Sequence, residues 1–225
     1  MTAWGVPAFR CLLGAEAVSL SGSAVSTVAL PALAVVELRA STTEVALLAF
    51  LGQLPNAFAL WAGALSDRHP KRPQLIASDL AAAGALVTIP ALAFTVGQLC
   101  VVVVVFGAAK VVHDAAAISL LPALVDQSQL HDANAKIGAA FSVADSAGTN
   151  AGAALVGAVG PVPSVPVDAL SFLSSAVLVW HMRVPEPATA PRARTGLAGT
   201  RRPGARLLHP RAVGHPRPRG RAARP

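Results

Sequence analysis

The sequence is poor in charged residues, which make up 13% of its 225 residues, against about a quarter in a typical soluble domain. It has two cysteines, Cys11 and Cys100, and no CxxC pair, so neither a disulfide framework nor a zinc site is indicated. There is also no Walker-type phosphate loop, no nucleophile–base pattern and no cluster of metal ligands. The sequence therefore indicates neither an enzyme, nor a bound cofactor, nor transport driven by ATP.

Apolar residues make up 54% of the sequence and gather in blocks close to the length that an α-helix needs to cross a bilayer. Small residues run through these blocks, as is typical where membrane helices pack closely. Prolines such as Pro122 and Pro166 mark connections, whereas Pro31, Pro55 and Pro90 lie within blocks and should kink them. The sequence thus predicts an all-α membrane protein, with spans at residues 11–36, 45–65, 74–96, 99–121, 137–159 and 165–182.

The lysines and arginines of the short connections fall on one side of the membrane if the chain crosses it six times. The opposite side has only Arg39, which lies near Glu37 and Glu44. We therefore expect a multi-pass protein of the inner (plasma) membrane with both termini in the cytoplasm and the lipid bilayer as a partner. The basic residues on the cytoplasmic side are Arg10, Arg68, Lys71, Arg72, Lys136 and Arg183.

The composition changes abruptly after Pro185. Residues 1–182 hold seven Lys or Arg and ten Asp or Glu, a balance of −3, whereas residues 183–225 hold eleven Arg and one Glu, a balance of +10. Residues 186–225 are mostly Arg, Pro, Gly and Ala without an apolar period, which predicts a disordered tail. The tail could bind anionic lipid, could bind nucleic acid through phosphates, or could be a run without a selected role. We favour the last, because GC-only codons encode these residues, as a frameshift or truncation near residue 200 would produce.

The connection after the second predicted span reads Gly63-Ala64-Leu65-Ser66-Asp67-Arg68-His69-Pro70-Lys71-Arg72. It resembles the G-x-L-x-D-R-x-x-R/K-R signature of the major facilitator superfamily, which lies at this place on the cytoplasmic side. Residues 19–31, 120–125 and 168–173 are similar to the branch of that family containing enterobactin-type and macrolide-type exporters.

The resemblance covers about residues 8–198, the N-terminal half of a transporter that normally has twelve spans. It implies six helices in a 3+3 inverted repeat and export of a small molecule driven by a proton gradient. The second half would be missing or supplied by a homodimer. The alternative is a non-transporting membrane remnant, or a scaffold or interaction protein.

The signature loop supplies the first group of candidate site residues. Gly63 would allow two helices to approach closely, and Asp67 can accept charge-assisted hydrogen bonds. In the family, such a cluster latches the two halves together and breaks as the transporter changes state, although a plain positive-inside anchor would have the same residues. The candidate gating residues are Gly63, Asp67, Arg68, Lys71 and Arg72.

Ionisable residues inside the predicted spans form the second group, because such groups are costly in a membrane. Lys110 and Asp114 are four residues apart, so they share a helical face and could form an internal pair, either along a transport path or as a structural contact. Glu16 either binds a coupling ion or reaches the interface, and Asp79 is expected to support the signature loop. With Asp145, these residues are the transport-path candidates, whereas His113 in the fourth span receives no separate role.

Overall fold

The computed structural model describes residues 3–66, 68–91 and 95–182. The chain separates into two units, Met1–Ala190 and Pro191–Pro225, and the predicted disordered tail lies outside the described residues. Within the described ranges the structure is all-α, with no strand. The helices are α1 (Pro7–Val36), α2 (Thr42–Gln53), α3 (Ala59–Ser66), α4 (Lys71–Ala91), α5 (Val96–Leu124), α6 (Leu130–Val159) and α7 (Pro161–His181), with short 3₁₀ turns η1 (Ala3–Gly5), η2 (Leu54–Phe58) and η3 (Gln127–Gln129).

Local sequence determines where several helices begin. Ser41 and Glu44 form a capping box that starts α2, and Thr95 and Gln98 form another that starts α5. Gly160, with a φ of 90°, reverses the chain before Pro161, which fits the first position of α7 because its missing N–H has no partner there.

The prolines act differently from one another. Pro55 lies in the 3₁₀ turn η2, which separates α2 from α3 and confirms the expected break in the second span. Pro31 and Pro90 lie inside α1 and α4. Pro122 and Pro166, expected in connections, lie inside α5 and α7 instead. The reason is that a membrane helix can continue past a proline when neighbouring groups satisfy the freed carbonyl.

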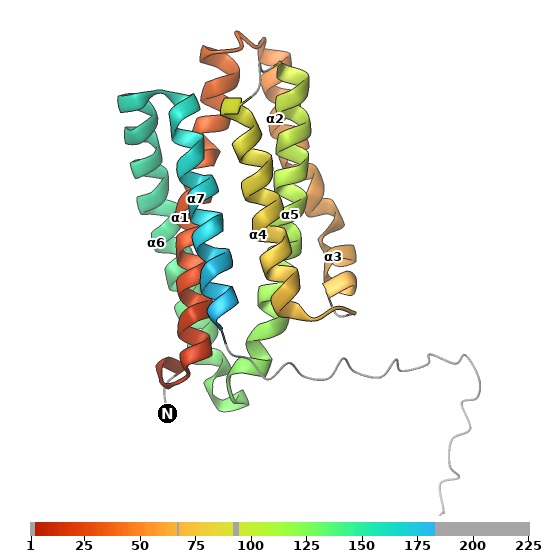
Figure 1. The fold of residues 1–225 in the computed structure, drawn as a ribbon, viewed down its shortest axis with the longest axis vertical. Coiled ribbons are helices and arrows are strands. Elements are labelled where there is room, and N and C mark those ends of the chain that lie inside the picture. Colours follow the sequence, from red (N-terminus) through yellow and green to blue (C-terminus); the bar gives the residue numbers. More distant parts are fainter. Residues whose placement is uncertain (1–2, 67, 92–94, 183–225) are drawn as a thin grey trace, which may run out of the picture. The chain divides into compact units, whose positions relative to one another are not determined.

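In the part of the chain that the structure describes, five helical segments are long and apolar enough to cross a membrane: Pro7–Val36, Thr42–Ala64, Lys71–Ala91, Val96–Leu124 and Pro161–His181. α6 occupies the predicted fifth span and has 30 residues, but it carries polar side chains such as Asp145, Thr149 and Asn150. It lies along α1 (Figure 1). With α6, the long helical segments of the described residues number six, as the sequence predicts.

The packing of these segments follows an inverted repeat. α1 packs on α6 and α7, while α5 packs in the same way on the α2–α3 segment and on α4. The paired helices also have matching lengths, with 30 and 29 residues in α1 and α5 and 21 each in α4 and α7. α1 to α4 and α5 to α7 therefore form the two halves of the 3+3 repeat that is typical of a major facilitator half.

The interior has two apolar clusters. One lies at the end that carries the chain's N-terminus, hereafter the loop end, and includes Phe9, Leu75 and Leu120. The other includes Leu33, Leu86 and Phe172. Between them α1, α4, α5 and α7 contribute buried polar side chains, which form a polar layer across the middle: Glu16, Ser19, Ser23, Ser78, Asp79, His113 and Ser175.

Close helix contacts occur at glycines other than the one predicted. A Cβ at Gly148 would lie 2.8 Å from Ala24 Cβ, and one at Gly152 would lie 2.8 Å from Val25 Cα, so α6 packs directly on α1 there. Gly63 makes no such close contact within the described residues, because no atom outside its own helix lies within 4 Å of a Cβ built there. The buried Ala62 is the neighbour that faces the interior from α3.

Candidate functional site

Two cavities adjoin at the centre of α5. One, of about 470 Å³, lies between α1, α2 and α5, and the other, of about 270 Å³, lies between α1, α5 and α6. Lys110 and Asp114 line both cavities. Lys110 is fourteen residues from each end of α5, which places it roughly 21 Å from either end at the rise of an α-helix. The cavities therefore meet at the depth where transporters of this architecture bind substrates.

The predicted pairing of Lys110 with Asp114 is confirmed. Lys110 Nζ lies 3.6 Å from Asp114 Oδ1, and their side chains are 28% and 46% exposed. The rest of the larger cavity is mostly apolar, with hydroxyl and amide groups from Ser26, Thr27 and Asn56. This lining suits a small amphipathic molecule better than a strongly charged one.

A histidine cluster lies beside the smaller cavity. His113 Nε2 on α5 is 3.1 Å from Glu16 Oε1 on α1, and His113 Nδ1 is 2.7 Å from Asp79 Oδ1 on α4. We use the name histidine cluster for Glu16, His113 and Asp79, whose side chains are 10%, 3% and 0% exposed. Three helices from both repeats thus meet at one imidazole.

Two sequence expectations change at this cluster. Glu16 does not reach an interface, because α1 begins at Pro7 and carries the carboxylate more than two turns into the interior. Asp79 does not support the signature loop, because its side chain is fully buried in the polar layer and contacts His113. Asp145 is exposed on α6 and lines neither of the two cavities, so the structure does not bring it together with the other transport-path candidates.

A second buried carboxylate joins α7 to α1. Asp168 is fully buried and accepts hydrogen bonds from Ser26 Oγ and, at 3.1 Å, from Ser171 Oγ. Gly22 makes this contact feasible, because a Cβ there would lie 1.9 Å from Ser171 Oγ. Asp168 comes seven residues after the start of α7, and Asp79 comes eight after the start of α4, so the two acids hold equivalent places in the two repeats.

The signature loop lies at the loop end, and Asp67, its acidic residue, lies outside the described residues. Lys71 Nζ donates to the backbone oxygen of Ser66, which closes the turn between α3 and α4. Arg72 Nε donates to Val179 O at 3.2 Å and Arg72 Nη2 to Trp180 O, so Arg72 caps the end of α7. Arg68 is exposed. Within this half, Lys71 and Arg72 therefore connect α3, α4 and α7.

The 3₁₀ turn η1 is also fixed at the loop end. Asp132, in the first turn of α6, accepts hydrogen bonds from Lys136 Nζ and, at 3.0 Å, from the backbone N–H of Ala3. These two hydrogen bonds, from Lys136 first and then from Ala3, lower the pKa of Asp132 below its ordinary value.

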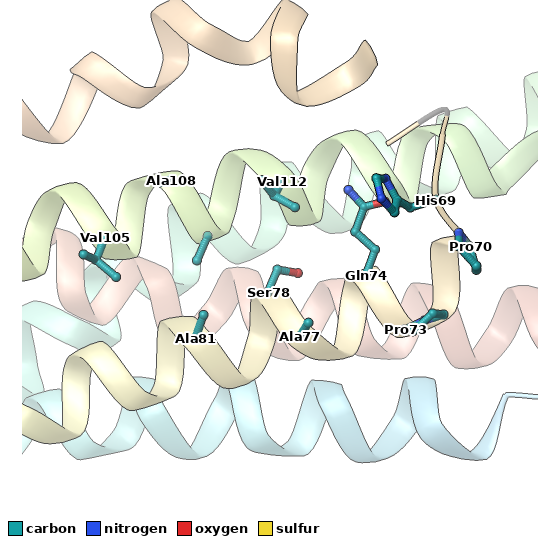
Figure 2. Close-up of a pocket in the computed structure, with 11 residues that line it drawn as sticks. His69, Pro70, Pro73, Gln74, Ala77, Ser78, Ala81, Val105, Ala108 and Val112 are labelled. Atoms are coloured by element: carbon teal, nitrogen blue, oxygen red, sulfur yellow. The ribbon is translucent and has the colours of Figure 1, made fainter. Parts of the chain in front are cut away.

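A separate cavity of about 560 Å³ runs between α4 and α5 from the loop end (Figure 2). Small side chains such as Ala77, Ala81 and Ala108 leave it open, and His69 is the ionisable residue in its lining. Figure 2 shows Gln74 beside His69 at the loop end of the cavity. Its apolar lining suits a lipid chain or a packed neighbour rather than ion chemistry.

Sequence reasoning missed His113 as the centre of a site and Asp168 as a buried acid. His113 lies 97 residues from Glu16 along the chain, so no local spacing links them, whereas the Lys110 and Asp114 pair is visible as a four-residue interval. The only sequence signal for His113 and Asp168 was an ionisable side chain within an apolar block.

The comparisons with known proteins agree with this architecture. Residues 3–207 match the family described as transmembrane secretion effector, of the major facilitator type. No curated protein matches the chain. Because the family match covers most of the chain, the protein belongs to the transmembrane secretion effector family of major facilitator transporters and is an integral membrane transporter protein.

Proposed function

We propose that this chain acts as the N-terminal half of a secondary transporter that exports small amphipathic molecules in exchange for protons. The observation that carries the proposal is the pair of cavities meeting at Lys110 and Asp114, midway along α5, in a chain of this family. Their volumes of about 470 and 270 Å³ are in the range of small-molecule sites. One half supplies one wall, so the opposite wall comes from a second copy of the chain or from a C-terminal half.

The proposed orientation places the loop end in the cytoplasm of a cell with an inner (plasma) membrane. The loop end carries Arg10, Lys71 and Lys136, and basic residues of short connections stay on the cytoplasmic side during insertion. In this orientation Asp79 lies roughly 12 Å from the cytoplasmic end of α4, at 1.5 Å per residue.

The signature loop has a proposed gating role in this cycle. Arg72 ties the start of α4 to the end of α7 through carbonyl oxygens. If α7 moves away from α4 during a change of state, these hydrogen bonds must break. If they persist, the signature loop must move together with α7. Gating therefore operates through contacts inside this half as well as through contacts with the opposite half.

Efflux of a fluorescent dye from proteoliposomes tests the proposal. The purified full chain is reconstituted, the vesicles are loaded with ethidium, and dye release is followed after a pH gradient is imposed. We expect release above the level of protein-free vesicles. Asp114→Asn should lower the rate about tenfold or more, which corresponds to a loss of roughly 1.4 kcal/mol, because Lys110 then stands unpaired in the cavity wall.

A matched control is available on α6. Asp132 and Lys136 form a second pair four residues apart, outside both cavities, so Lys136→Gln should leave the dye rate within about twofold of wild type. Release no faster than in protein-free vesicles, across several amphipathic dyes, would instead support the membrane remnant or scaffold. Equal effects of Asp114→Asn and Lys136→Gln would show that the cavity is not the transport path.

A further inference from the structure

The histidine cluster carries an unbalanced charge in a membrane-spanning interior. Two carboxylates, Glu16 and Asp79, flank one imidazole, His113, at 3.1 and 2.7 Å. With both acids ionised and the imidazole protonated, the cluster has a net charge of −1. A net charge is costly to bury in a membrane, so the cluster reaches neutrality most easily by taking up one further proton.

The neighbouring charged groups do not supply the missing positive charge. On α5 itself, Lys110 is engaged with Asp114. The α2–α3 segment from Val45 to Ala64 has no ionisable side chain. α7 contributes Asp168, which is held by hydroxyl groups. α6 faces the adjacent cavity with Asn134, Ile137 and Phe141, and none of these is ionisable.

The negative charge of Asp79, at the inner end of the cluster, is the least well compensated by hydrogen bonds. Asp79 is 0% exposed, and neither of its carboxylate oxygens has a hydrogen bond of ordinary geometry among the described residues. His113 Nδ1 approaches it closely but off the direction that a hydrogen bond requires. A buried carboxylate without such bonds is costly as an anion, and one added proton removes that cost.

The outer end of the cluster opens to a cavity. Glu16 lines the smaller cavity with Lys110 and Asp114, whereas His113 and Asp79 do not line it. A proton arriving from the cavity can bind the Glu16 carboxylate, and the protonated imidazole can then release its Nδ1 proton to Asp79. The cluster then holds two neutral carboxylic acids and a neutral imidazole that keeps its proton on Nε2. No other reactant is needed, because each step moves one proton between neighbouring polar atoms.

We propose that Glu16, His113 and Asp79 form the proton-binding site of this transporter, loaded from the smaller cavity at Glu16, while Lys110 and Asp114 face the transported molecule. The inference rests on the proposed function for its role in transport. Protonation of Glu16 weakens its attraction to His113 and so loosens α1 from α5, the two helices that bound both cavities. Proton uptake thereby changes the shape of the substrate cavities.

Asp168 provides a matched control within the same chain. It holds the equivalent place in the second repeat and is equally buried, but its partners are Ser26 and Ser171 rather than a histidine. Asp168→Asn therefore removes a buried carboxylate without touching the histidine cluster. Glu16→Gln and Asp79→Asn keep the size and polarity of the cluster residues that they replace.

The first measurement is proton binding by the full chain in detergent, followed as the infrared band of protonated carboxyl groups after a pH jump. We expect a band that disappears when the pH is raised. The contribution of the histidine cluster to this band should be lost in Glu16→Gln and in Asp79→Asn and should remain in Asp168→Asn. Absence of any titrating carboxyl in the folded wild-type protein overturns the proposal without any variant. Loss of the band only in Asp168→Asn also overturns it.

The second measurement separates proton coupling from substrate movement. In proteoliposomes, Glu16→Gln should lower pH-driven ethidium accumulation about tenfold or more while leaving ethidium counterflow within about twofold of wild type. If Glu16→Gln lowers accumulation and counterflow equally, or lowers neither, the assignment of the proton-binding site is overturned. If the wild type shows no counterflow yet loses its carboxyl band in Glu16→Gln, the proposed transport function fails while the proton site stands.

Discussion

Substituting Gly152 by alanine tests how closely α6 packs on α1. The new Cβ would lie 2.8 Å from Val25 Cα and 3.3 Å from the backbone oxygen of Ala24. Because carbon atoms rest about 3.5–4.0 Å apart, α6 must withdraw from α1 by roughly 1 Å at this point. The contact is with backbone, so no side-chain rotation relieves it, and we expect a loss of about 1–3 kcal/mol in the free energy of unfolding.

Gly157, on the same helix, supplies the control. Among the described residues, no atom outside its own helix lies within 4 Å of a Cβ built there, and alanine favours a helix over glycine by up to about 1 kcal/mol. Gly157→Ala should therefore be neutral or stabilising. The assay is unfolding in mixed micelles of dodecyl maltoside and SDS, followed by circular dichroism. Equal unfolding midpoints for Gly152→Ala and Gly157→Ala would contradict the packing of α6 on α1 in Figure 1.

Two further predictions concern the loop end. Arg72→Ala removes two hydrogen bonds to carbonyl oxygens at the end of α7, so we expect the free energy of unfolding to fall by about 1–2 kcal/mol in the same assay. Arg72→Lys should have an intermediate effect, because lysine lacks the guanidinium fork. An equally large loss in Arg68→Ala, at an exposed residue, would contradict this reasoning. The pKa of Asp132 is lowered in the folded state, so its stabilising effect is present above its unfolded pKa of about 3.9 and is lost as the pH falls through the folded value. The unfolding midpoints of wild type and Asp132→Asn should therefore converge below about pH 4, and a constant difference across that range would refute the assignment.

Much of the architecture could be predicted from the sequence, because apolar length is a direct consequence of bilayer thickness. The start of α5 at Val96 falls three residues from the predicted residue 99, and its end at Leu124 falls three beyond the predicted 121. At α7, the sequence does not predict where the helix begins. The sequence predicts that Pro166 marks a connection, but α7 begins at Pro161, which fits the first position of a helix, and continues past Pro166.

The site was less predictable, for a reason that depends on distance along the chain. Lys110 and Asp114 share one helix, so their pairing follows from helical spacing. His113 meets Glu16 and Asp79 only because α1, α4 and α5 pack together, and the sequence carries no register between helices. The same limit explains Gly63 and Gly152, because only the packed structure shows which glycine faces another helix.

Proton movement coupled to dye movement tests the central claim most directly. The full chain is reconstituted in vesicles that contain a trapped pH-sensitive dye, without an imposed pH gradient, and ethidium is added outside. An exchanger that moves the molecule inward must move protons outward, so the account predicts that the vesicle interior becomes alkaline in wild type and in Asp168→Asn, but not in Glu16→Gln. Ethidium entry through wild-type protein without any change in internal pH would contradict it.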